Sequence, residues 1–521
     1  MKTKIFLFLI LIFAFSLRLY GINWDQCFHL HPDERMLIMV TDRISFFNNL
    51  NPDFFNYGSL PIYLLKGITQ LLDYLFKTQL SHYNGMLIVG RILSTSFDLL
   101  TIIFIYHIAN ILFRNKKISL FSSFFYAIAF FSIQNSHFFV VDVFLTTFTT
   151  ILIYLLLLYL KSPSIKKTVF IAIIFAAMLA TKITAIIFVP IVWLMIIIKS
   201  KQKLLSFFTF NLSLLTFHFL FMPYVYLDFQ KFFTDINLQM KMNSDPYIFP
   251  YTLQYVGTIP YLYYLKNIFL WGLGPIISIL SIAGLLSLRA KRSNLFLFLI
   301  FYILYFLIVG RSAVKFMRYM LPLYPFLAIL AGYGLYKLYE LYKLLAYILI
   351  IAIFSWSFMF MNIYSQPHTR ISATEWILKN IPKGSTLTTE HWDDGLPLYG
   401  GENYKFEELT LYDQPDDEVK WQILNEKLKR TDYIIIASNR LYVPLQKLSD
   451  CNKFKSCYPL TVQYYQKLFS GLLDFKKVAE FSVYPKLEIG NWKLEIRDDV
   501  ADESFTVYDH PKIMIFKKRV Q

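Results

Sequence analysis

The sequence predicts a polytopic all-α membrane protein with a small α/β domain at its C-terminal end. Three observations predict this class. Of the 521 residues, 56% are hydrophobic and 19% aromatic, and the mean hydropathy is +0.46, which an ordinary soluble enzyme does not reach. Apolar runs of about 17–25 residues, long enough to cross a bilayer, recur up to residue 364. Beyond that residue the apolar runs shorten to strand length, as in Tyr433–Ala437 and Lys512–Phe516.

The first apolar run, Ile5–Leu19, follows Lys2 and Lys4 and resembles a signal peptide. No small-x-small cleavage site follows it, and Arg18 and Tyr20 fit an interface anchor, so we predict a membrane helix. Ten further spans are predicted, which makes eleven in all and puts the two chain ends on opposite sides of the membrane. They cover residues 84–112, 118–136, 143–160, 168–181, 183–198, 204–222, 266–288, 294–310, 319–336 and 344–364.

These spans divide the chain into a transmembrane domain, 1–364, and a second domain, 365–521. A long outer loop, 23–82, follows the first span and contains two candidate amphipathic helices, near 34–47 and 60–76.

Basic residues gather in alternate loops, and by the positive-inside rule these loops and the N-terminus are cytoplasmic. The basic clusters are Arg114/Lys116/Lys117, Lys161/Lys166/Lys167, Lys199/Lys201/Lys203, Arg289/Lys291/Arg292 and Lys337/Lys343. Among the acidic residues before residue 364, only Glu340 falls on the cytoplasmic side, and Asp98 lies within a span. The pattern predicts a multi-pass protein of the plasma (inner) membrane with 365–521 outside. Any carboxylate chemistry then takes place on the outer face.

The formal net charge of +16 does not indicate nucleic-acid binding. A nucleic-acid surface concentrates its basic residues on one face, whereas these lie in short clusters between apolar runs, next to the lipid bilayer.

The stretch His29–Arg35 directly follows the first span and carries the strongest candidate chemistry. Pro32 suits the first position of a helix, and Asp33 and Glu34 then fall in its first turn, where the helix dipole favours negative charge. Successive helical residues point about 100° apart, so one carboxylate can face a site while the other braces it. The alternative is an acidic helix start without catalysis.

Arg91 lies near the outer end of the second span, and Asp98 lies deeper on the same helical face. Ionisable residues inside a span are costly and are candidates for function. For Asp98 a structural ion pair between two helices is an equal alternative. Arg91 can reach outward to an anionic group, which favours function.

Two further candidates lie at predicted outer turns. Asp142 precedes the fourth span, where a helix N-cap is the alternative role and is compatible with function. Lys182 lies between two half-length spans, where anchoring at the interface is an equal alternative.

The loop Arg311–Arg318 is basic although it is predicted to lie outside, against the positive-inside trend. Three cations on the outer face need an anionic partner, and a lipid-linked phosphate would supply one. Binding of ordinary lipid headgroups is the alternative.

No metal ligand set is predicted. His29 with His31, and Glu390–Asp394, have only short ligand pairs, for which turn or cap roles are favoured. No cofactor is assigned, and a divalent metal has no support in the spacing. Cys451 and Cys457 could close a small disulfide if their segment is extracytoplasmic.

These residues give the chain a resemblance to the GT-C superfamily of glycosyltransferases, and more closely to family 39, the protein O-mannosyltransferase and lipid A aminoarabinose transferase group. Four matches carry the resemblance: His31-Pro32-Asp33-Glu34, Gly90-Arg91-Ile92-Leu93-Ser94, Asp142, and Arg318–Pro325. In addition, Phe505–Lys512 resembles an ending of bacterial relatives that have an outer domain.

The resemblance implies the GT-C fold, a polyprenyl-phosphate sugar donor and transfer on the outer face to a protein, glycan or lipid acceptor. In this hypothesis Asp33 is the base, Glu34 is a sugar ligand or brace, and Asp142 is the second acidic position. Arg91, Lys182 and Arg318 lie near the donor phosphate, and single displacement inverts the anomeric configuration. The alternative function is a transporter or flippase of lipid-linked sugars. A membrane-anchored sensor would leave the outer carboxylates unexplained.

Overall fold

The computed structural model describes residues 2–288 and 293–519, so the predicted basic cluster Arg289/Lys291/Arg292 lies outside the described residues. The chain divides into two compact units, each described by itself. The helical unit comprises residues up to Ile22, His31–Met240 and Ile259–Phe358. The sheet-containing unit comprises Asn23–Leu30, Lys241–Thr258 and Met359–Gln521.

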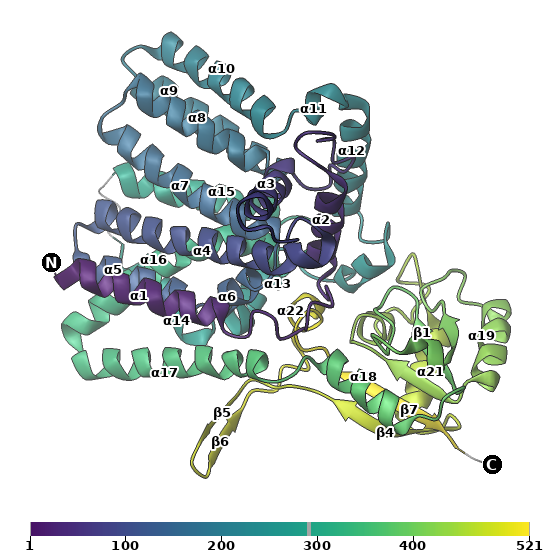
Figure 1. The fold of residues 1–521 in the computed structure, drawn as a ribbon. Helices are drawn as coiled ribbons and strands as arrows, with labels where there is room; N and C mark the ends of the chain where they lie inside the picture. The colour runs from purple at the N-terminus through teal and green to yellow at the C-terminus, as the bar shows by residue number, and fades with distance from the viewer. Residues whose placement is uncertain (1, 289–292, 520–521) are drawn as a thin grey trace. The chain divides into compact units, whose positions relative to one another are not determined.

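Helices account for most of the helical unit (Figure 1). The first ten are α1 Lys2–Leu19, α2 Pro32–Arg43, α3 Ser59–Phe76, α4 Tyr83–Phe113, α5 Lys116–Ala127, α6 Phe130–Ser136, α7 Val141–Lys161, α8 Ile165–Leu179, α9 Val189–Lys199 and α10 Lys203–Phe221. They are followed by α11 Tyr224–Leu227, α12 Phe229–Ser244, α13 Leu262–Asn267, α14 Pro275–Leu286, α15 Ser293–Val309, α16 Tyr324–Leu341 and α17 Lys343–Met361. Short 3-10 segments, η1 Ile183–Phe188 and η4 Met317–Leu323, precede α9 and α16.

Helical segments occupy each of the eleven predicted spans. In the described part of the chain, five segments are long and apolar enough to cross a membrane: Tyr83–Phe113, Val141–Lys161, Lys203–Phe221, Met317–Leu341 and Lys343–Asn380. Helices α5 and α6, bent by 56° at a short break, make a sixth if they are one broken span. The class of a mainly helical membrane protein is therefore confirmed, whereas the count of eleven spans stays a prediction.

The helical unit is built by side-by-side packing of these helices (Figure 1). Helix α4 packs against α5 and α7, α8 lies against α7 and α10, and α16 contacts both α5 and α14. Glycine allows the closest approach: a Cβ on Gly284 would lie 2.0 Å from the carbonyl oxygen of Leu330, and one on Gly334 would lie 2.2 Å from that of Leu280. Small residues at such crossings let helix backbones touch, as is common inside membranes.

The sheet-containing unit has a five-stranded mixed sheet in the order β2-β1-β3-β7-β4. Its strands are β1 Thr386–Glu390, β2 Lys405–Leu409, β3 Tyr433–Ile436, β4 Phe475–Phe481 and β7 Ile513–Lys518. Strand β1 is parallel to β2 and β3, and β7 is antiparallel to β3 and β4. Strands β5 Lys486–Ile489 and β6 Trp492–Glu495 form a separate hairpin, and the helices are α18 Thr369–Asn380, α19 Glu418–Arg430, α20 Tyr442–Leu445, α21 Pro459–Phe469 and α22 Glu503–Thr506.

Alternation along β3 separates two cores, one on each face of the sheet. Tyr433 and Ile435 belong to a core with residues of α18, while Ile434 and Ile436 belong to a core with residues of α19 and α21. The two strands predicted at Tyr433–Ala437 and Lys512–Phe516 are thus present as β3 and β7. The segments 23–30 and 241–258 also belong to this unit, a membership that no sequence signal indicated.

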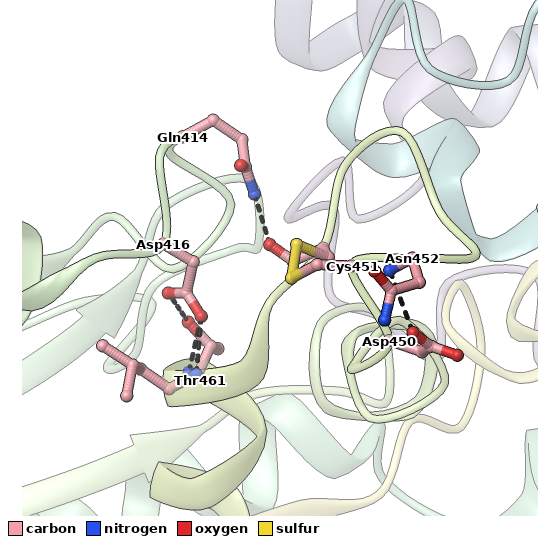
Figure 2. Close-up of a disulfide and its surroundings, with 8 residues drawn as sticks. Gln414, Asp416, Asp450, Cys451, Asn452 and Thr461 are labelled. Carbon is pink, nitrogen blue, oxygen red and sulfur yellow. Dashed lines mark hydrogen bonds between the residues drawn. A yellow bond between two sulfur atoms is a disulfide. The ribbon is translucent and has the colours of Figure 1, made fainter.

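The disulfide that the sequence left open is formed, between Cys451 and Cys457 (Figure 2). Near it, the Gln414 side chain donates to the Cys457 carbonyl oxygen at 2.9 Å. Asp416 accepts from the backbone N–H groups of Leu460 and Thr461 in the first turn of α21, at 2.8 and 3.0 Å. These contacts satisfy N–H groups that would otherwise lack partners at the start of the helix.

Candidate active site

Helix α2 begins at Pro32, as the sequence predicts. The residue before it, His31, is the N-cap, and its ring atom Nδ1 accepts the backbone N–H of Asp33 at 3.2 Å. His31 therefore has the capping role that was favoured over a metal ligand. This start holds Asp33 and Glu34 in the first turn, from which their side chains leave in different directions.

Asp33 is paired with Arg318, whose Nη2 lies 2.7 Å from Asp33 Oδ2. The hydroxyl of Tyr57 also donates to this carboxylate. Burial raises the pKa of Asp33, but the opposing effects of Arg318, His31 and Tyr57 prevail and hold it below its ordinary value of 3.8. The Asp33 side chain is 21% exposed, so an ionised carboxylate remains reachable from outside the protein.

Asp142 is paired with Lys182, with 2.7 Å between Lys182 Nζ and Asp142 Oδ1. The other oxygen, Oδ2, lies 3.6 Å from Arg318 Nε. The N-cap of α7 is Val140, so Asp142 does not cap this helix. Lys182 Nζ lies 4.5 Å from the centre of the Tyr319 ring, which adds a cation–π contact.

Four predicted residues therefore meet in one cation–carboxylate cluster: Asp33, Asp142, Lys182 and Arg318. They come from α2, the first turn of α7, the turn after α8, and η4. The positive charges of Arg318 and Lys182 balance the two carboxylates. Of the four side chains, only those of Asp33 and Lys182 are more than a tenth exposed. Such an arrangement can hold a phosphate on its cations while a carboxylate accepts a proton.

The other two predicted residues, Glu34 and Arg91, form a sealed pair. Arg91 Nη2 and Nε lie 2.8 and 3.0 Å from the two oxygens of Glu34, and both side chains are 0% exposed. Glu34 also accepts the backbone N–H of Phe139 at 2.8 Å, and Arg91 donates to the Ile22 carbonyl oxygen at 2.7 Å. The structure thus pairs Arg91 with Glu34, and a place for Arg91 near the donor phosphate stays a prediction.

Asp98 takes part in a buried structural ion pair. Its carboxylate lies 2.6 Å from Arg18 Nε and accepts the hydroxyl of Tyr126, also at 2.6 Å. Arg18 has no exposed surface, so its predicted role as an interface anchor is wrong. Asp98 ties α4 to α1 and α5, which matches the structural alternative for this residue.

The backbone before α3 is pinned next to Lys182. Gly58 donates its N–H to the Thr181 carbonyl oxygen at 3.0 Å, and Leu60 donates to that of Ala180 at 2.9 Å. A Cβ on Gly58 would lie 2.0 Å from the Ala180 oxygen, so only glycine fits. This contact joins the segment that carries Tyr57 to the segment that carries Lys182.

A small cavity of about 10 Å³, room for one water molecule, lies beside this contact. Its lining is both polar and apolar and includes Asn56, Tyr57, Leu179, Ile183 and His218. Two of these residues neighbour cluster elements directly, since Tyr57 contacts Asp33 and Ile183 follows Lys182. Among the described residues, no group of three or more His, Cys, Asp or Glu side chains is arranged to hold a metal ion.

Sequence reasoning missed Tyr57, Tyr319 and Arg18. Tyr57 lies in a loop without periodicity, and Tyr319 was only part of a longer matching stretch. Arg18 carried a signal that was available: it is a basic residue within an apolar run, like Arg91, and its buried partner Asp98 had already been identified.

Known proteins resemble this chain in part of the sequence and in the whole fold. Residues 75–227 match the family model described as dolichyl-phosphate-mannose-protein mannosyltransferase. The matched segment contains Arg91, Asp142 and Lys182, whereas Asp33, Glu34 and Arg318 lie outside it. No curated protein sequence matches the chain.

Two solved structures share the fold at low sequence identity. The oligosaccharyltransferase from Archaeoglobus fulgidus in its apo form matches with a TM-score of 0.52 and 11% identity, over 99% of this chain and 88% of that one. ArnT from Cupriavidus metallidurans in the apo state matches with a TM-score of 0.51 and 13% identity, over 86% of this chain and 95% of that one. The oligosaccharyltransferase AglB from Archaeoglobus fulgidus, solved with an inhibitory peptide and a dolichol-phosphate, matches with a TM-score of 0.51 and 11% identity, over 99% of this chain and 88% of that one.

Residues 75–227 thus match a mannosyltransferase family model, and the chain shares its fold with the archaeal oligosaccharyltransferase and with ArnT, both of which agree with the resemblance seen in the sequence. With its apolar helices, the chain is an integral membrane protein.

Proposed function

We propose that this protein transfers a sugar from a polyprenyl-phosphate donor to an acceptor hydroxyl on the outer face of the plasma membrane, with inversion at the anomeric carbon. The observation that carries the proposal is the cation–carboxylate cluster, in which a reachable carboxylate, Asp33, lies against Arg318. Support comes from the mannosyltransferase family match and from the dolichol-phosphate bound to AglB.

In this mechanism the acceptor oxygen bonds to the anomeric carbon while the bond from that carbon to the phosphate oxygen breaks. The hydroxyl proton passes to Asp33, and polyprenyl phosphate leaves with the electron pair. Phosphate needs no protonation to leave, so cations aimed at it lower the barrier most. Arg318 and Lys182 are the residues that we assign to the phosphate.

The ion pairs of the cluster suggest how binding prepares the base. Arg318 holds the pKa of Asp33 down, against the effect of burial, when no donor is present. A donor phosphate would draw Arg318 and Lys182 toward itself and leave Asp33 with less positive charge nearby. The pKa of Asp33 then rises, and the carboxylate becomes a stronger base when the donor is bound.

The sealed pair of Glu34 and Arg91 supports this reaction by holding the first turn of α2 in place. Arg91 fixes both oxygens of Glu34, and the Phe139 N–H fixes one of them again. Because Glu34 is adjacent to Asp33 in the same helical turn, a fixed Glu34 sets the orientation of that turn. We therefore assign Glu34 and Arg91 as positioning residues.

The experiment uses purified protein in lipid with a labelled polyprenyl-phosphate sugar and a crude acceptor extract, and measures released polyprenyl phosphate and labelled acceptor separately. Asp33→Asn keeps the shape of the side chain but cannot accept the proton, so turnover falls by roughly 10²–10⁴ while donor affinity changes little. Lys182→Met removes one cation and weakens donor binding by roughly 10- to 100-fold.

Two results would overturn the proposal. Near wild-type turnover by Asp33→Asn would show that Asp33 is not the base. Donor that crosses the bilayer with no sugar ever transferred would favour the flippase alternative.

The outer-face assignment has a separate test. The positive-inside pattern and the disulfide, which is typical of oxidising compartments, support an extracytoplasmic location for residues 365–521. Reporters fused after residues 340 and 400 should report opposite sides of the membrane. Both on one side would contradict the topology.

A further inference from the structure

Polar residues gather where two neighbouring parallel strands of the sheet end. Strand β1 leads into residues 391–394, and β3, parallel to β1, leads into 438–440. In open α/β sheets, ligands bind outside the carboxyl ends of parallel strands. This edge is therefore the place in the sheet-containing unit to look for a ligand site.

Buried polar contacts hold the backbone in place at this edge. Arg370 binds Asp393 at 3.1 Å and Asp394 at 3.2 Å, and the Ser438 hydroxyl donates to Asp393 at 2.5 Å. Arg370 and Asp393 have side chains that are only 1% exposed, whereas that of Asp394 is 18% exposed. The buried contacts hold the loop after β1, and Asp394 is the carboxylate that remains nearest to solvent.

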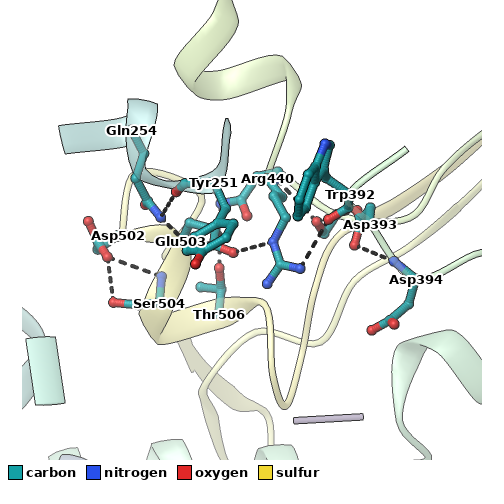
Figure 3. A network of polar contacts seen from close by, with 12 residues as sticks. Tyr251, Gln254, Trp392, Asp393, Asp394, Arg440, Asp502, Glu503, Ser504 and Thr506 are labelled. Atoms are coloured by element: carbon teal, nitrogen blue, oxygen red, sulfur yellow. Dashed lines mark hydrogen bonds and ion pairs between the residues drawn. The ribbon is translucent and has the colours of Figure 1, made fainter. Parts of the chain in front are cut away.

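A second ion pair extends this edge (Figure 3). Arg440 Nε lies 2.8 Å from Glu503, and its Nη1 donates to the Trp392 carbonyl oxygen at 3.3 Å. Gln254 donates to the other Glu503 oxygen at 2.8 Å. Segments that are far apart in the sequence thus converge on Arg440.

The loop also presents an aromatic surface. Trp392 is 41% exposed although it is a large apolar residue, and its backbone has φ of +80°, a conformation that costs energy for a residue with a Cβ. The ring of Tyr251 lies beside it, with 6.0 Å between ring centres (Figure 3). A strained backbone that keeps an indole at the surface is explained by a ligand that the indole contacts.

One buried polar atom in the turn after β3, on the residue before Arg440, has no partner within the described part of the chain. Asn439 is only 8% exposed, and its amide nitrogen donates to the Thr506 hydroxyl at 3.5 Å. Among the described residues its amide oxygen, Oδ1, has no hydrogen-bond partner. Buried polar atoms are usually paired, so this oxygen is available to a ligand hydroxyl.

The charges at this edge restrict the ligand class. Two arginines, Arg370 and Arg440, face three carboxylates, those of Asp393, Asp394 and Glu503. The excess of negative charge disfavours phosphates and acidic sugars. An exposed indole and a half-buried tyrosine ring, together with hydrogen-bonding carboxylate and amide oxygens, suit a neutral molecule with one apolar face and many hydroxyl groups.

We propose that Tyr251, Trp392, Asp394, Asn439 and Arg440 form a binding site for a neutral saccharide, and that this saccharide is the acceptor of the transfer reaction. The acceptor role rests on the proposed function, whereas saccharide binding does not. The Trp392 and Tyr251 rings cover the apolar face of a sugar ring, and Asp394 and Asn439 accept its hydroxyl groups.

The test is a saturation-transfer NMR titration of full-length protein in lipid nanodiscs, without any donor. The probes are α-1,6-mannobiose, N,N′-diacetylchitobiose, glucuronic acid and a serine-rich peptide. Trp392→Gly removes the ring and also relieves the positive φ, so folding is preserved. We expect at least one neutral disaccharide to bind wild-type protein, and its Kd to rise about tenfold or more in Trp392→Gly.

Matched variants separate the site from general effects. Trp392→Phe should recover most of the affinity, and Trp492→Ala, which changes an 84% exposed tryptophan of the β5–β6 hairpin, should bind like wild type. Binding of neither disaccharide at tens of millimolar, equal binding by Trp392→Gly, or preference for the peptide would overturn the proposal. In a turnover assay, Trp392→Gly should raise the KM for the acceptor and leave donor affinity unchanged. An inactive wild-type enzyme that still binds the disaccharide would contradict the proposed function alone.

Discussion

Asp33 and Glu34 are adjacent in one helical turn, yet they belong to two different kinds of ion pair. Glu34 and Arg91 have no exposed surface, and Arg91 donates two hydrogen bonds to the Glu34 carboxylate. Asp33 and Arg318 share a 2.7 Å contact in which the carboxylate is 21% exposed. The comparison shows that a single helical step separates a carboxylate that can meet a substrate from one that cannot.

The two pairs also differ in what it costs to break them. A buried pair is hard to separate, because each charge left alone has lost its water. A partly exposed pair can exchange partners, since solvent or a ligand can replace the lost contact. The cation–carboxylate cluster can therefore open to a donor while the sealed pair keeps the helix start in place.

The largest expected effect comes from breaking the sealed pair. Arg91→Met leaves the Glu34 carboxylate buried without its cation, and we expect a loss of about 3–5 kcal/mol in the free energy of unfolding. Thermal unfolding in detergent measures it. Lys337→Met, which breaks a surface pair with Glu340, is the control and should cost less than about 1 kcal/mol. Adding Glu34→Gln to Arg91→Met should recover part of the lost stability. If Arg91→Met alone is as stable as wild type, the two ion pairs do not differ in the way proposed.

The pH dependence of turnover gives the next effect. Burial raises the pKa of Asp33 and Arg318 lowers it, with a net decrease below 3.8. The carboxylate is thus present above that lowered pKa, and both activity and its contribution to stability are lost only as the pH falls through it. Arg318→Gln removes the largest lowering effect, so the acid limb of kcat/KM should move to higher pH. Lys231→Gln, at a pair with Asp235, should leave the limb in place; an unmoved limb in Arg318→Gln would exclude Asp33 as the titrating base.

The smallest effect concerns Tyr57, which donates one hydrogen bond to Asp33. Tyr57→Phe removes only the hydroxyl, so turnover should fall roughly 2- to 10-fold, as the loss of one hydrogen bond implies. Steady-state rates at saturating donor measure it. Tyr74→Phe, at an exposed tyrosine of α3, serves as the control. A decrease as large as that of Asp33→Asn would instead make Tyr57 part of the proton transfer.

Local features of the sequence predicted much of this site. Pro32 marked the start of α2, and the 100° step between neighbouring helical residues anticipated that Asp33 and Glu34 would differ. The strands β3 and β7 followed from short apolar runs. Each of these signals is contained in fewer than ten consecutive residues.

The pairings between distant residues could not be predicted in the same way. Glu34 and Arg91 are 57 positions apart, and Arg18 and Asp98 are 80 apart, so only the packing of α1, α2 and α4 decides which cation meets which carboxylate. Any of several buried arginines could have matched by charge alone. The membership of 241–258 in the sheet-containing unit is likewise decided by packing, through residues such as Leu253.

Gly58 packs against the end of α8 and holds two parts of the site together. Because the missing side chain of Gly58 lets the two backbones bond, the segments that carry Tyr57 and Lys182 are held together at this point. An alanine at position 58 would therefore displace Tyr57 and Lys182, although neither residue is itself substituted. The geometry of the site therefore depends on a glycine that has no functional side chain.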